Sequence, residues 1–133
     1  MPYRSVTPRV TLQENQAIRG YCRILNYSIT QFVEIAVIET IHRMGIFTPL
    51  DLVGREMHWQ DEPQRKTTSV QTRLTANFAP SNFDLAQEVA KAAKTTMSLF
   101  VIGCTLRYIA TRKKLMGGLS RELAELELPE QYA

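Results

Sequence analysis

Two short segments of the chain alternate apolar residues with side chains that form hydrogen bonds. The polar positions are Thr7, Arg9 and Thr11 within residues 6–12, and Gln71, Arg73, Thr75 and Asn77 within residues 70–78. A period of two places each set on one face of a β-strand. Hydroxyl, amide and guanidinium groups all donate hydrogen bonds, so both faces are suited to binding.

The remaining polar residues do not form a pattern that is typical of catalysis. His42 falls at the end of a helical pattern, where we expect it to cap carbonyl groups, and His58 lies near Asp61 and Glu62 in a polar connection. The sequence contains no phosphate-binding loop, nucleophile elbow or Cys and His spacing of a metal site. We therefore expect no enzymatic activity, no catalytic residue, no metal and no cofactor.

Length and composition predict one ordinary domain. The chain has 133 residues, of which 44% are hydrophobic and 22% charged, with a formal net charge of +3. Its longest apolar run, residues 97–104, is far below the ~20 residues of a membrane span, and no export signal is evident. We expect a cytoplasmic protein that does not bind membranes. Cys22 and Cys104 occupy apolar helical positions and are expected to be buried, reduced thiols.

Two helical patterns follow each two-faced segment. In the first half we expect helices over residues 14–25 and 29–42, separated by a turn at Asn26, with Ser28 and Gln31 forming a capping box. In the second half a helix starts near Pro80, and Thr95 or Thr96 caps another that ends at Gly117. The order strand, helix, helix thus occurs twice.

This duplication divides the chain into a first unit (6–42), a linker (43–69), a second unit (70–114) and a tail (115–133). When Ser28 is aligned with Thr95, apolar positions of the second helices coincide and Ala36 falls on Gly103. Small residues there would let two helices cross closely. The alternative is an unrelated α+β domain in which two similar stretches arise by chance.

The two-faced strand followed by this helical template resembles the ribbon-helix-helix family of DNA-binding proteins. Two halves in one chain resemble its single-chain tandem members, such as the TraY family. The resemblance covers residues 6–42 and 70–109. It implies an α+β, mostly α fold: a tandem ribbon-helix-helix pseudo-dimer with a two-stranded antiparallel ribbon and four core helices. Pro8 cannot donate to a strand ladder, so we expect weak pairing around it.

The resemblance also implies a partner, double-stranded DNA, read by the ribbon in the major groove. Arginine suits guanine, Asn or Gln suits adenine, and Thr suits a base edge or a thymine methyl group. The expected base-reading residues are Thr7, Arg9, Thr11, Gln71, Arg73, Thr75 and Asn77. The alternative is a solvated strand face.

The N-termini of the second helices would then contact phosphates, because their free amides and dipoles favour anions. The expected phosphate-contacting residues are Ser28, Ile29, Thr30, Thr95, Thr96 and Met97, together with Arg65 and Lys66 at the ribbon edge. Ordinary helix capping without a ligand would use the same helix-end residues.

Because the two reading faces differ, we expect a monomeric pseudo-dimer that reads a non-palindromic site, with cooperative binding left open. Its role would be transcription regulation or service as a plasmid conjugation (relaxosome) accessory factor. The alternative from another class is a helical protein-interaction or assembly module that does not bind DNA. We expect a tail helix over residues 120–127, with Leu119, Leu123 and Leu126 on one side, either covering the core or docking a protein partner.

Overall fold

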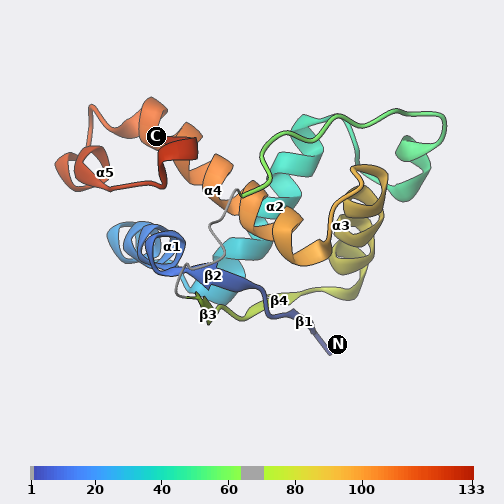
Figure 1. Cartoon of the computed structure of the whole chain (residues 1–133), viewed down its shortest axis with the longest axis horizontal. Helices are drawn as coiled ribbons and strands as arrows, with labels where there is room; N and C mark the ends of the chain where they lie inside the picture. Colours follow the sequence, from blue (N-terminus) through green and yellow to red (C-terminus); the bar gives the residue numbers. More distant parts are fainter. Residues whose placement is uncertain (1, 64–70) are drawn as a thin grey trace.

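Two short strands and two long helices occur in the same order in each half of the chain. The computed structural model describes residues 2–63 and 71–133, and its fold is α+β and mostly α (Figure 1). In chain order its elements are β1 (Arg4–Val6), β2 (Arg9–Thr11), α1 (Leu12–Leu25), α2 (Ile29–Arg43), the 3-10 turn η1 (Pro49–Leu52), β3 (Gln71–Arg73), β4 (Ala76–Phe78), α3 (Pro80–Ala92), α4 (Met97–Met116), α5 (Arg121–Glu125) and the 3-10 turn η2 (Glu130–Tyr132).

The strands pair between the halves to form one antiparallel ribbon. β1 pairs with β4, so that Arg4 faces Phe78, and β2 pairs with β3, so that Arg9 faces Arg73. Both stretches keep the same register, which brings Thr7 opposite Thr75 and Pro8 opposite Leu74 between them. The prediction of a two-stranded antiparallel ribbon is confirmed.

Pro8 explains why the ribbon consists of two short stretches. The Leu74 amide donates to the Pro8 carbonyl at 3.0 Å. An antiparallel pair of this type normally exchanges two hydrogen bonds, but proline has no N–H to return the second. Pairing is therefore weakened at Pro8, as the sequence predicts, and the register continues on both sides.

Local capping sets the helix boundaries and shifts the predicted start of the first helix. Thr11 and Glu14 form a capping box: the Glu14 amide donates to Thr11 Oγ1 at 3.1 Å, and the Thr11 amide donates to Glu14 Oε1 at 2.9 Å. Because Thr11 is the N-cap, α1 begins at Leu12 and not at residue 14. Ser28 is the N-cap of α2, but the predicted capping box with Gln31 is wrong: no side-chain cap bond forms there.

The helix pairs have the same geometry in both halves. The axis turns by 99° between α1 and α2 and by 99° between α3 and α4. In Figure 1 the ribbon runs along the lower side, α1 and α3 stand at the two flanks, and α2 and α4 lie between them. Within the described ranges no single helix is long and apolar enough to cross a membrane, although each bent pair taken together reaches that length and composition.

The backbone corrects the predicted alignment of the halves by one residue in the helices. Asn26 and Lys94 both adopt positive φ angles, 58° and 59°, and each lies two residues before the N-cap of the next helix. The N-caps are Ser28 and Thr96, not Ser28 and Thr95. With the two N-caps aligned, Phe32 corresponds to Phe100, Val33 to Val101 and Ile41 to Ile109.

The corrected alignment also covers the ribbon. Val6, Pro8 and Val10 correspond to Leu74, Ala76 and Phe78, and all six are buried. Thr7 then corresponds to Thr75, its partner across the ribbon. The repeat is therefore carried by backbone turns and buried positions more than by residue identity.

The core joins helices of both halves through aromatic rings. The ring of Phe32 in α2 lies with its centroid 5.0 Å from Tyr21 in α1 and 5.7 Å from Tyr108 in α4. Phe100 in α4 instead contacts Trp59 of the linker, with centroids 4.9 Å apart. Cys22 and Cys104 are buried free thiols, as predicted.

The linker packs closely on α4 at Gly103. A Cβ atom there would lie 2.4 Å from the Asp61 carbonyl oxygen and 3.0 Å from Trp59. The Asp61 carboxylate accepts hydrogen bonds from Arg107 at 2.7 and 3.0 Å, and its carbonyl accepts one from the Tyr132 hydroxyl at 2.7 Å. Gly103 thus allows the linker to approach α4 closely. The prediction that this glycine lets two helices cross closely is wrong.

The tail covers α1 and α4. Leu123 is fully buried, Leu126 is partly buried with Cδ1 2.8 Å from where a Cβ on Gly20 would lie, and Lys113 Nζ donates to the Leu126 carbonyl at 2.7 Å. The tail helix therefore lies on the core. Leu119 does not share its face, because it remains 87% exposed.

Gly103→Ala is expected to lower the free energy of unfolding by about 1–3 kcal/mol, because a methyl group there meets linker backbone. Gly20→Ala is the matched control: it also lies inside a helix, but only the flexible end of Leu126 must move, and alanine favours the helix. Urea unfolding followed by circular dichroism measures both. Equal stability of the two variants would contradict the tight packing of the linker.

Stability is also expected to fall at alkaline pH. Burial raises the pKa of the Cys22 thiol to about 11, whereas an unfolded thiol titrates near ~8.5. The stabilisation is therefore full below about pH 8.5 and is lost as the pH rises through the folded pKa. Unfolding midpoints measured from pH 8 to 11 should decline less in Cys22→Ala than in the unchanged protein, and parallel declines would refute this contribution.

Candidate nucleic-acid interface

One face of the ribbon is apolar and buried, and the other presents polar side chains to solvent. The exposed face has Ser5, Thr7 and Arg9 on one strand and Arg73, Thr75 and the partly buried Asn77 on the other. Alternation along each strand produces this division, since neighbouring side chains point to opposite sides. The face therefore brings together five of the seven predicted base-reading residues, plus Ser5.

Cross-strand neighbours on this face follow from the register. Ser5 lies opposite Asn77, Thr7 opposite Thr75, and Arg9 opposite Arg73. We call these six residues the ribbon face. Thr7 and Thr75 form its centre, and the two other pairs form its ends.

The arginine end holds two positive charges side by side. Neither Arg9 nor Arg73 forms an ion pair with a carboxylate in the part of the chain that the structure describes. Like charges directly opposite each other destabilise a strand pair. This end is consequently suited to an anionic or strongly hydrogen-bond-accepting partner.

At the other end, a hydrogen bond joins the strands. The Ser5 hydroxyl donates to Asn77 Oδ1 at 2.9 Å. Residue 5 was missed by the sequence interpretation, which began the strand at Val6. Its signal was the same alternation extended one step towards the N-terminus, because Ser5 precedes a buried valine and lies two residues before Thr7.

The two other predicted base-reading residues lie beyond the arginine end. Thr11 lies opposite Gln71. Thr11 Oγ1 accepts the Glu14 amide as the N-cap of α1, so this threonine serves helix capping. Gln71 is exposed at the end of β3.

The predicted phosphate-contacting residues mostly lie at the beginnings of α2 and α4, on the ribbon side of the molecule (Figure 1). Ser28 Oγ lies 3.0 Å from Thr30 Oγ1, and Ile29 is the first residue of α2. Thr96 caps α4 by accepting the Leu99 amide at 3.2 Å, and Met97 follows it.

Thr95 is not the cap. Its buried Oγ1 has no hydrogen-bond partner among residues 2–63 and 71–133. Arg65 and Lys66 lie outside the described residues.

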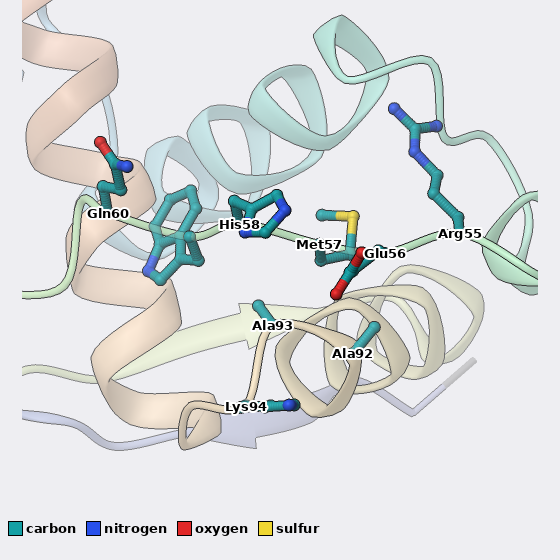
Figure 2. Close-up of a pocket in the computed structure, with 9 residues that line it drawn as sticks. Arg55, Glu56, Met57, His58, Gln60, Ala92, Ala93 and Lys94 are labelled. Carbon is teal, nitrogen blue, oxygen red and sulfur yellow. The ribbon is translucent and has the colours of Figure 1, made fainter.

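A hollow lies between the linker and the end of α3. It has a volume of about 480 Å³ and is lined by Arg55, Glu56, Met57, His58, Trp59, Gln60, Ala92, Ala93 and Lys94. Figure 2 shows Arg55 and Lys94 at opposite sides of this hollow, with the exposed His58 between them. The charged groups do not converge on one point, and no cluster suited to a metal occurs in the described part of the chain.

Comparisons with protein-family models, with curated proteins and with solved structures find no match to this chain.

Arg73→Gln is expected to raise the unfolding midpoint at low salt by relieving repulsion from Arg9, an effect of roughly 0.2–1 kcal/mol for a cross-strand pair. The gain should shrink with added salt, which screens exposed charges. Thermal unfolding at 20 mM and 500 mM NaCl measures it.

Arg4→Gln is the control, because it removes the same charge from a residue that pairs with Asp84 at 3.4 Å and lies over the Phe83 ring. An equal gain from this variant would mean that net charge alone is responsible.

Proposed function

We propose that this protein binds double-stranded DNA sequence-specifically, as a tandem ribbon-helix-helix pseudo-dimer that places its ribbon in the major groove. The observation that carries the proposal is the ribbon face. Strands from both halves form one antiparallel ribbon with an exposed row of hydrogen-bonding side chains that includes Arg9 opposite Arg73. A two-stranded ribbon fits the major groove of B-DNA, where arginine, asparagine and threonine suit the edges of bases.

The symmetry of the backbone supports the pseudo-dimer. Identical 99° turns between the helices, matching positive φ angles at Asn26 and Lys94, and matching buried positions relate the two halves. The relating axis passes between Thr7 and Thr75, which are both equivalent positions and paired neighbours. In a duplex this axis would lie over the centre of the site.

The surroundings of the ribbon support an anionic partner. The helices α2 and α4 begin on the ribbon side, so their free amides and positive dipole ends are available to flanking phosphates. The acidic tail, with Glu122, Glu125 and Glu130, lies on the side of the molecule away from the ribbon (Figure 1). The negative charge of the tail therefore does not oppose a duplex on the ribbon.

Within this function we propose either transcription regulation or an accessory role at the transfer origin of a plasmid or other mobile element. Both roles use the same binding chemistry and differ in where the DNA site lies. Sequences selected by the protein from a genomic library would separate them, because regulators select promoters and transfer factors select origins.

DNA binding is expected to depend on the arginines of the ribbon face. Arg9→Ala and Arg73→Ala should each weaken binding to a selected duplex by about tenfold or more, the loss of a bidentate base contact. Fluorescence anisotropy with a labelled duplex and unlabelled random competitor measures the affinity, which should also fall steeply with salt.

Arg121→Ala is the matched control. It removes one positive charge from the tail helix, where the side chain is 89% exposed. Its affinity should stay close to that of the unchanged protein. Folded variants that all bind equally, or a protein that retains no duplex in the presence of competitor, would exclude the ribbon as a reader and favour an assembly module without DNA contact.

A further inference from the structure

The two ends of the ribbon face are related by the axis through Thr7 and Thr75, yet they carry different chemistry. Resting on the proposed DNA binding, we propose that the end with Arg9 and Arg73 selects guanines in one half of the DNA site, whereas the end with Ser5 and Asn77 selects adenine in the other half. The two halves of the site are thus distinguished by base type.

Antiparallel pairing creates this difference. Each half of the chain contributes one arginine to the face. The register places Arg9 directly opposite Arg73, so both arginines fall on the same side of the axis. By the alignment of the halves, Arg9 corresponds to Asn77 and Arg73 corresponds to Ser5, which pair on the other side.

The arginine end fits guanine for two reasons. A guanidinium group donates two parallel hydrogen bonds, which match the O6 and N7 acceptors of guanine in the major groove. Both groups are also free of ion pairs with described carboxylates, so a duplex relieves their mutual repulsion without first breaking a salt bridge. Two arginines on neighbouring strands would read guanines in adjacent base pairs.

The other end has the hydrogen-bonding capacity that adenine requires. Asparagine pairs with adenine by accepting from N6 and donating to N7. Asn77 Oδ1 accepts the Ser5 hydroxyl at 2.9 Å, which holds the amide in place. An amide oxygen has a second lone pair, and both amide N–H groups remain for a base. The neighbouring Arg4 is not part of the ribbon face, because its guanidinium pairs with Asp84 at 3.4 Å and lies over the Phe83 ring.

Selection from a random duplex library with the full chain tests the inference. Two double variants make the ends alike: Arg9→Asn with Arg73→Ser places the asparagine–serine pair at both ends, and Ser5→Arg with Asn77→Arg places the arginine pair at both ends. We expect the unchanged protein to select guanines on one side of the centre and adenine on the other. The first variant should lose the guanine preference, and the second should select guanines symmetrically on both sides.

A measurement on the unchanged protein avoids dependence on the folding of the variants. Replacing the selected guanines by 7-deazaguanine removes the N7 acceptor and keeps the base pair. Affinity should fall about tenfold or more, whereas the same change at a guanine placed outside the site should have little effect.

The results separate this inference from the proposed function. A perfect palindrome with guanines in both halves, or selected guanines that tolerate 7-deazaguanine, would overturn the inference and leave DNA binding intact. If no sequence is enriched over the starting library, the proposed function and this inference both fail, because the protein then recognises no specific DNA site.

Discussion

Strand pairing between the two halves is the constraint on which the rest of the structure depends. Neither half pairs its strands within itself, because β1 and β2 find their partners in β4 and β3. A two-stranded ribbon is only marginally stable alone, so one face must be buried. Val6, Val10, Leu74 and Phe78 bury that face in a core built by helices from both halves. The ribbon therefore depends on the core for the burial of its apolar face.

The outward face carries the energetic consequence of this pairing. Placing Arg9 opposite Arg73 brings like charges together on an exposed strand pair, which costs stability in the free protein. At the symmetry-related end, Ser5 and Asn77 satisfy one another with a hydrogen bond. The molecule thus combines a nearly symmetric backbone with a ribbon face whose two ends are chemically unlike.

The linker and tail break the symmetry of the core as well. Both pack on α4, where Asp61 receives the Arg107 guanidinium and the Tyr132 hydroxyl. Trp59 covers Phe100, whereas the equivalent Phe32 is covered by tyrosines of α1 and α4. Gly103 leaves room for the linker on α4, whereas the equivalent position of α2 is Ile35. The linker and tail therefore give α2 and α4 different neighbours.

The sequence by itself determined the order of elements, the two-faced strands, the buried cysteines and the weak pairing at Pro8, because periodicity and proline geometry act over a few residues. It also indicated five members of the ribbon face. Only the tertiary structure decided which side chains meet across the strands, since register depends on burial in both halves at once. That register brought both arginines to one end and paired Ser5 with Asn77 at the other. The tertiary structure also showed that Asn26 and Lys94 are equivalent positions of the two halves, because both have a positive φ although their residue types differ.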